Sequence, residues 1–259
     1  MLTFGSLFSG IGGLDLGLER AGMQCRWQSE IEPYCVKVLQ KHWPHVQNLG
    51  DINGIEWERV EPVDVICGGY PCQPFSVAGA RNGAEDARHL WPRFADAIRV
   101  LRPRYALLEN VTGHLSLGFG DVLADLAACG YDTQWDCVPA AAVGAPHLRD
   151  RVFVIATRSD MADTDSVVMG QRRITQPDPT TCRSGRYNRS RETTDDLWQW
   201  WQTEPDVDRV ADGIPARVDR LRALGNAVVP QVAQHVAQTI IEMERINNDG
   251  RFHDRRSTP

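Results

Sequence analysis

The sequence lacks a hydrophobic run of membrane-spanning length, and its first residues, Met1 to Phe8, contain neither a basic leader nor a long apolar segment. A transmembrane helix needs about 20 consecutive apolar residues, and a secretory signal peptide carries a basic segment before its apolar one. We therefore expect a cytoplasmic protein that makes no contact with a membrane.

The seven cysteines show no CxxC spacing. Structural zinc sites usually carry such pairs, and small disulfide-rich domains usually carry an even set of cysteines. The spacing therefore predicts neither a metal site nor disulfides, and it suits a reducing compartment.

The chain also lacks an overall excess of positive charge, because its formal net charge is −6. A negative sum argues weakly against a nucleic-acid partner, but charge can be unevenly distributed. Between residues 171 and 191 six arginines stand against one acid, Asp178. Such a cluster can bind DNA phosphates, and a solvated loop would have the same composition. The candidate DNA-binding residues of this stretch are Arg172, Arg173, Arg183 and Arg186.

Short apolar runs alternate with amphipathic stretches through the first half of the chain, as in βα units around a mostly parallel sheet. The expected strands are residues 2–8, 63–67, 105–109, 131–138 and 151–157, and the expected helices are 11–21, 90–101, 122–127, 217–224 and 229–243. The sequence predicts an α/β fold with a doubly wound, mostly parallel sheet.

Hydrophobic periodicity fails between residues 158 and 216, where Thr, Asp, Arg, Gly, Pro and Trp dominate. We expect one main domain, formed by residues 1–157 and 217–246, with 158–216 as a small irregular insertion. Residues 247–259 are polar enough to predict a disordered tail.

A glycine-rich segment, Phe8-Ser9-Gly10-Ile11-Gly12-Gly13, follows the first expected strand and opens a helix. Glycines at such a place let the backbone approach a ligand closely. The segment departs from the dinucleotide pattern GxGxxG because Asp15 occupies the third glycine position, so NAD is disfavoured. Glu30 follows the next strand, where a carboxylate can accept hydrogen bonds from ribose hydroxyls, although a solvated surface acid would fit equally.

Cys72 lies in Gly68-Gly69-Tyr70-Pro71-Cys72-Gln73-Pro74-Phe75-Ser76, directly after a β-branched run. The two prolines cannot donate the backbone hydrogen bonds of a helix interior or central strand, so Cys72 is expected on a loop. Glu109 ends the strand that begins at Tyr105, and its carboxylate is expected at the same edge of the sheet. Partial burial there would raise its pKa and let it hold a proton.

The Cys72 segment resembles the nucleophile loop of the DNA (cytosine-5) methyltransferases, with their Pro-Cys-Gln core. Phe8–Gly13 resembles the family's first S-adenosylmethionine loop. Pro146–Arg151 resembles the Gln-x-Arg-x-Arg block, with His147 in place of glutamine, and Ala223–Pro230 resembles the last block. The matching blocks follow the family's order, at residues 4–22, 30–31, 50–52, 67–79, 109–111, 146–156 and 221–230.

The resemblance implies a fold of the class I S-adenosylmethionine methyltransferase type, with 158–216 as a target-recognition region. It implies Cys72 as the nucleophile, Glu109 at N3 of the base, Arg149 bracing the nucleophile loop and Arg151 near the flipped base. The implied cofactor residues are Phe8, Gly10, Ile11, Gly12, Gly13, Glu30, Ile31, Asp51, Ile52, Pro71, Asn226 and Ala227, with Asp51 toward the adenine amine and both isoleucines against the ring. Gln73 and Ser76 are added to the DNA-binding candidates.

The resemblance thus implies methyl transfer from S-adenosylmethionine to C5 of a flipped-out cytosine in double-stranded DNA, by a monomer and without a metal. Two alternatives stay open from the residues alone: an RNA cytosine-5 methyltransferase and a catalytically silent DNA-binding relative. The recognition region is short, and the sequence leaves open whether it acts alone, with a cognate restriction enzyme, or with another subunit. The target sequence is also left open.

Overall fold

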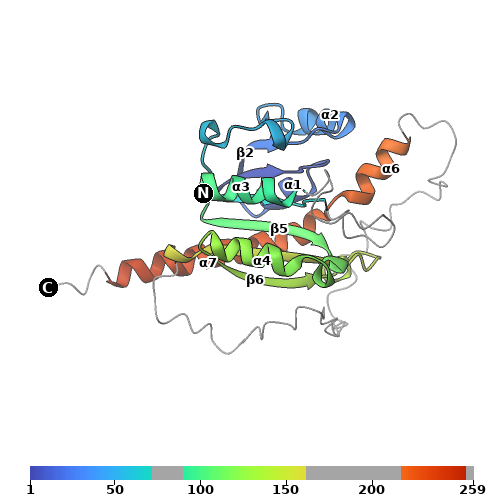
Figure 1. Ribbon diagram of the computed structural model, residues 1–259. Helices are drawn as coiled ribbons and strands as arrows, with labels where there is room; N and C mark the ends of the chain where they lie inside the picture. Colours follow the sequence, from blue (N-terminus) through green and yellow to red (C-terminus); the bar gives the residue numbers. More distant parts are fainter. Residues whose placement is uncertain (72–89, 162–216, 255–259) are drawn as a thin grey trace.

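A seven-stranded sheet forms the centre of the molecule in this computed structural model, which describes residues 1–71, 90–161 and 217–254 (Figure 1). The strand order is β3-β2-β1-β4-β5-β7-β6. Strands β1 to β5 pair in parallel, whereas β7 pairs antiparallel with both β5 and β6. The strands are β1 (Thr3–Leu7), β2 (Gln24–Ser29), β3 (Gln47–Asn48), β4 (Val65–Gly68), β5 (Tyr105–Val111), β6 (Tyr131–Val138) and β7 (Arg151–Arg158).

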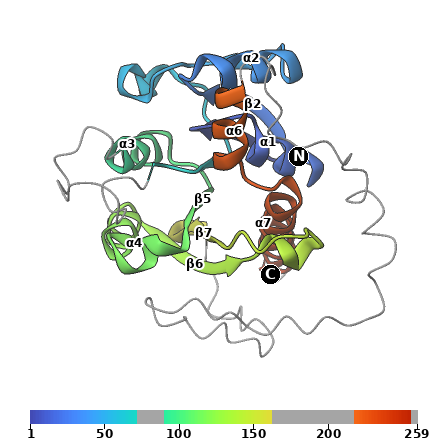
Figure 2. The ribbon, with the colours of Figure 1, turned by 90° about the vertical axis from the view of Figure 1, so that its right-hand side faces the viewer.

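Helices cover both faces of the sheet, with α3 and α4 on one side and α1 and α7 on the other (Figure 2). The helices are α1 (Gly13–Arg20), α2 (Pro33–His42), α3 (Trp91–Leu101), α4 (Phe119–Ala128), α6 (Arg217–Asn226) and α7 (Pro230–Asp254). Short 3₁₀ turns connect them: η1 (Ile52–Gly54), η2 (Trp57–Arg59), η5 (Thr112–Ser116), η6 (Ala140–Val143) and η7 (Ser159–Met161). The predicted α/β class with a mostly parallel sheet is confirmed.

The two faces of the sheet bury separate cores because successive side chains of a strand point in opposite directions. On β4, Ile66 packs with the apolar residues of α3 and α4, whereas Val65 and Cys67 pack with those of α1 and α7. Central parallel strands are buried on both faces, which is why β4 and β5 read as continuous apolar runs.

Helix α7 returns the end of the chain to the main sheet and packs along α1. It continues as a helix to Asp254, so the expected disordered tail is wrong for residues 247–254. The polar composition of this stretch suggested disorder, but a helix that is already nucleated adds one hydrogen bond per residue. Asn247 also donates a hydrogen bond to the hydroxyl of Tyr105 at 3.3 Å.

Two other expectations concern the rest of the chain. Residues 162–216, which make up most of the expected recognition region, lie outside the described residues.

Cys137 on β6 is disulfide-bonded, so the expectation of no disulfides is wrong at this residue. Spacing along the sequence reports only local pairs, whereas a disulfide depends on which residues the fold brings together. Within the described ranges no helix is both long and apolar enough to cross a membrane.

Candidate active site

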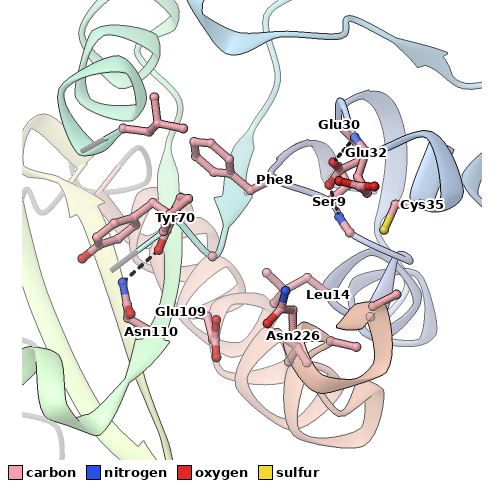
Figure 3. A pocket seen from close by; sticks show the side chains of 18 of the residues that line it. Phe8, Ser9, Leu14, Glu30, Glu32, Cys35, Tyr70, Glu109, Asn110 and Asn226 are labelled. Carbon is pink, nitrogen blue, oxygen red and sulfur yellow. Dashed lines mark hydrogen bonds between the residues drawn. The ribbon is translucent and has the colours of Figure 1, made fainter. Parts of the chain in front are cut away.

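A cavity of about 730 Å³ opens at the carboxyl ends of the parallel strands. Its walls come from the β1–α1 loop, the ends of β2, β4 and β5, and the junction between α6 and α7. In doubly wound folds ligands bind at this edge because loops from several strands converge there. Figure 3 shows Glu109, Asn110 and Tyr70 on one side of the cavity, Glu30, Glu32 and Cys35 on the other, and Asn226 between them.

The β1–α1 loop places its backbone at the cavity because several of its residues adopt left-handed conformations. Phe8, Gly10 and Gly12 have φ values of 54°, 57° and 81°. Phe8, Gly10 and Gly13 line the cavity, but Ile11 and Gly12 do not. A Cβ on Gly12 would lie 2.5 Å from the ring of Trp43, so this glycine serves close packing.

Glu30 ends β2, and its carboxylate is held by three backbone amides. Oε2 accepts a hydrogen bond from the amide of Gly10 at 2.7 Å, and Oε1 accepts from Ile31 and Glu32, both at 2.8 Å. The side chain therefore ties the β1–α1 loop to the end of β2. Because each carboxylate oxygen has two acceptor sites, Oε2 keeps one for a ligand.

Asp51, Ile52 and Ile31 line the same side of the cavity. Asp51 caps the 3₁₀ turn η1 through a 2.9 Å hydrogen bond from the amide of Asn53 to Oδ1. Ile52 is buried, whereas Ile31 is 65% exposed. One fixed and one exposed apolar side chain thus lie beside a carboxylate, an arrangement suited to a flat heterocycle with an amine.

Glu109 is the most perturbed acid of the cavity. It is 8% exposed, and Nε of Arg151 lies 3.0 Å from its Oε1. Burial raises the pKa of Glu109 to about 7, although the charges of Arg151 and Arg149 act to lower it. The group can therefore hold or release a proton near neutral pH.

The backbone before Cys72 packs directly against this carboxylate. A Cβ on Gly69 would lie 2.6 Å from Oε2 of Glu109, so only glycine fits without displacing the acid. The backbone carbonyl of Tyr70 accepts a 3.1 Å hydrogen bond from Nδ2 of Asn110 (Figure 3). The side-chain hydroxyl of Tyr70 lies 2.8 Å from Nε2 of His114. The end of β4 is thus fixed to β5 and η5, and Pro71 leads from it toward Cys72.

Cys72 itself lies outside the described residues, as do the DNA-binding candidates Gln73, Ser76, Arg172, Arg173, Arg183 and Arg186. The position of the thiol relative to Glu109 therefore stays a prediction. Of the residues implied by the resemblance, the structure brings ten cofactor candidates together with Glu109 and Arg151: Phe8, Gly10, Gly13, Glu30, Ile31, Asp51, Ile52, Pro71, Asn226 and Ala227.

A family model described as C-5 cytosine-specific DNA methylase matches residues 2–209. The chain belongs to this family.

Named relatives and a solved structure agree with this membership of the C-5 cytosine-specific DNA methylase family. The chain is 34% identical over 170 residues to the Type II methyltransferase M.HgiCII of Herpetosiphon aurantiacus, which covers 62% of this chain and 38% of the relative. It is 33% identical over 177 residues to the orphan methyltransferase M.Rho11sI of Bacillus phage rho11s, covering 65% and 35%. Thus it spans less than half the length of these relatives.

A crystal structure of a DNA modification methyltransferase encoded within an E. coli prophage superposes with a TM-score of 0.55 at 28% identity. The match covers 64% of this chain and 49% of that one. Over the matched part, the fold of this methylase-family chain is therefore similar to that of this prophage-encoded protein.

Arg149 contacts the junction between α6 and α7. Its guanidinium donates hydrogen bonds to the carbonyls of Gly225 and Ala227, at 2.7 and 2.6 Å. Bracing of the nucleophile loop stays a prediction, because residues 72–89 lie outside the described part of the chain. Arg151, by contrast, lines the cavity beside Glu109.

Several cavity residues carry no signal in the sequence pattern. Asp219 and Arg222 come from α6, and a terminal nitrogen of Arg222 lies 3.9 Å from a carboxylate oxygen of Glu32, the residue before α2. A charged residue on a short helix looks like an ordinary surface residue in sequence. Tyr70 and Asn110 could have been found from their positions beside Pro71 and Glu109.

Proposed function

We propose that this chain is a DNA cytosine-5 methyltransferase that uses S-adenosylmethionine. The observation that carries the proposal is Glu109: a buried carboxyl with a pKa of about 7 at the end of β5, facing the same cavity as the glycine loop. Family membership supports the same activity. Because the chain spans less than half of its relatives, the activity of the whole protein is part of the proposal.

The cavity suits S-adenosylmethionine in size, shape and charge. Five acids and two arginines line it: Glu30, Glu32, Asp51, Glu109, Asp219, Arg151 and Arg222. An acidic lining favours a cationic sulfonium. Glu30 would accept from ribose hydroxyls with the free acceptor site of Oε2, Asp51 would accept from the adenine amine, and Ile31 and Ile52 would hold the ring. When bound, the cofactor supplies the methyl group.

The protein's own groups would activate the base. The thiolate of Cys72 adds to C6 of cytosine and forms a carbon–sulfur bond, so that C5 becomes an enamine carbon that can accept a methyl group. Glu109 holds a proton at N3 and stabilises the charge that develops on the ring during this addition. Arg151 orients the Glu109 carboxyl and remains near the base. Loss of the C5 proton to water then re-forms the C5–C6 double bond and breaks the carbon–sulfur bond, which releases the thiolate.

The substrate would be double-stranded DNA with the target cytosine flipped out. A stacked base cannot reach a cavity at the end of a sheet, and extrusion costs a few kcal/mol. The arginines of the recognition region would bind phosphates and fix the register on the duplex. We also propose a cytoplasmic monomer that acts as a restriction-modification or an orphan phage-type enzyme.

The proposal is tested by base-resolution sequencing of 5-methylcytosine in DNA from a host without its own cytosine methylation. The unaltered chain should methylate cytosines in one short motif, and Cys72→Ala should methylate none. Cys129→Ala is a matched control because Cys129 is a free, buried cysteine at the end of α4, where it does not line the cavity. Soluble unaltered protein that methylates only RNA, or nothing, would refute the DNA activity in favour of one of the two alternatives.

A further inference from the structure

Arg149 joins two parts of the molecule that are far apart in sequence. One terminal nitrogen of its guanidinium donates to the carbonyl oxygens of Gly225 and Ala227, 76 and 78 residues away. The last carbonyls of a helix have no partner within the helix, and an arginine can satisfy them. Arg149 therefore caps the end of α6 from outside.

The two carbonyls lie on either side of Asn226, which lines the cavity (Figure 3). Val228, two residues after Asn226, packs against the glycine loop. A Cβ on Gly13 would lie 2.3 Å from the carbonyl oxygen of Val228. The backbone from 225 to 228 thus runs from the Arg149 guanidinium to the start of α1. A displacement of this backbone would move both Asn226 and the wall of the cavity at Gly13.

The backbone of Arg149 is itself in an unusual conformation. Its φ is 40°, in the left-handed region that non-glycine residues rarely adopt. The amide of Ala140 donates a 2.6 Å hydrogen bond to the carbonyl of Leu148, which closes the loop just before Arg149. Strained backbone of this kind persists where the surroundings hold it and is found preferentially at functional sites.

From these contacts we infer that Arg149 is a positioning residue for the cofactor side of the site: it holds the Gly225–Val228 backbone against the glycine loop so that Asn226 and Ala227 line the cofactor cavity. The inference rests on the proposed use of S-adenosylmethionine. It differs from a role at the base, because Arg149 does not line the cavity, whereas Arg151 does.

The charge of Arg149 has a separate effect, which the test must distinguish. Together with Arg151, it acts to lower the pKa of Glu109. Loss of the positive charge alone would therefore change the pH dependence of the reaction. Loss of the two hydrogen bonds would change cofactor binding. Arg149→Lys keeps the charge but loses the planar donor group, and Arg149→Ala loses both.

Arg158 provides a matched control at the other end of β7. Its guanidinium donates a 2.7 Å hydrogen bond to the carbonyl of Arg102, 56 residues away, but it does not line the cavity. Arg158→Ala therefore removes a comparable long-range bond without touching the α6–α7 junction. A merely structural role for Arg149 would make the two alanine variants alike.

The experiment measures the binding of S-adenosylmethionine and S-adenosylhomocysteine by titration calorimetry, on full-length variants shown to be folded by circular dichroism. We expect about tenfold weaker binding for Arg149→Ala, a clear loss for Arg149→Lys, and unchanged binding for Arg158→Ala. Equal affinity of the unaltered protein and Arg149→Ala, or full recovery by Arg149→Lys, would overturn the inference while leaving the proposed function intact. No binding by the unaltered protein would overturn the proposed cofactor site and the inference with it.

If Arg149→Ala fails to fold, Arg149→Lys and Arg149→Gln decide the matter by the same titration. The glutamine amide also has two N–H donors on one nitrogen, but its side chain is shorter and uncharged and cannot reproduce the reach of the guanidinium. Weaker binding than that of the unaltered protein in both variants supports the inference, and unchanged affinity in both variants overturns it.

Discussion

Replacing Glu109 by glutamine should make the free energy of unfolding less sensitive to pH. In the folded protein burial raises the pKa of this carboxyl to about 7, from an ordinary value of 4.5. The folded state therefore binds the proton more tightly than the unfolded state. The stabilisation from this group is fully present below about pH 4.5 and is lost as the pH rises through about 7.

The size of the effect follows from the displacement of the pKa. Each pH unit corresponds to about 1.4 kcal/mol, so ionisation of Glu109 costs the folded protein about 3 kcal/mol by pH 8. Glutamine has nearly the same shape and does not titrate. Its altered contact with Arg151 adds an offset that depends little on pH, because arginine keeps its charge throughout this range.

The measurement is urea unfolding followed by circular dichroism, from pH 4.5 to 8.5, for the unaltered protein and Glu109→Gln. The free energy of unfolding of the variant minus that of the unaltered protein should grow by about 3 kcal/mol across this range, since all other titrations cancel. Asp15→Asn is a useful comparison. Asp15 is fully buried with a pKa of about 6. The difference in free energy of unfolding between Asp15→Asn and the unaltered protein should therefore develop at lower pH. A pH-independent difference for Glu109→Gln, or one of opposite sign, would refute the argument.

Three further predictions concern activity and DNA binding. Gly69→Ala should lower the methylation rate at least about tenfold, because its Cβ would lie 2.6 Å from Oε2 of Glu109, whereas Gly54→Ala, with open space around it, should leave the rate unchanged in a single-turnover assay. The rate should fall as the pH rises above about 7, since Glu109 must hold a proton, and a rate that climbs steadily to pH 9 would contradict this role. Arg183→Ala combined with Arg186→Ala should weaken DNA affinity and reduce its dependence on salt, and an unchanged slope in fluorescence anisotropy would exclude phosphate contacts there.

Much of the architecture could be predicted from local patterns. The apolar runs and the helical periodicity located most strands and helices, because each pattern reflects how a single element buries one face. Helix α2 and the two-residue strand β3 were not among the expected elements. The antiparallel direction of β7 could not be predicted in this way. It depends on where the chain enters the sheet after β6, and a buried strand shows the same composition in either direction.

The candidate active site could likewise be predicted only in part from the sequence. The pattern placed Glu30 at the end of β2, but only the fold showed that three backbone amides occupy its carboxylate. Ile11 and Gly12 belong to the glycine motif and yet do not line the cavity, and Gly12 instead packs against the ring of Trp43. Membership of the glycine motif therefore does not determine which of its residues line the cavity.

By itself, the sequence determined the alternation of strands and helices, the acid at the end of β5 and the family to which the chain belongs, because these depend on neighbouring residues or on motifs within one segment. Only the tertiary structure decided the pKa of Glu109 and the partners of Arg149. A pKa is set by desolvation and by charges that converge from distant segments, and the carbonyls that Arg149 caps lie more than 70 residues away along the chain. Such properties exist only in the folded protein, where segments distant in sequence are in contact.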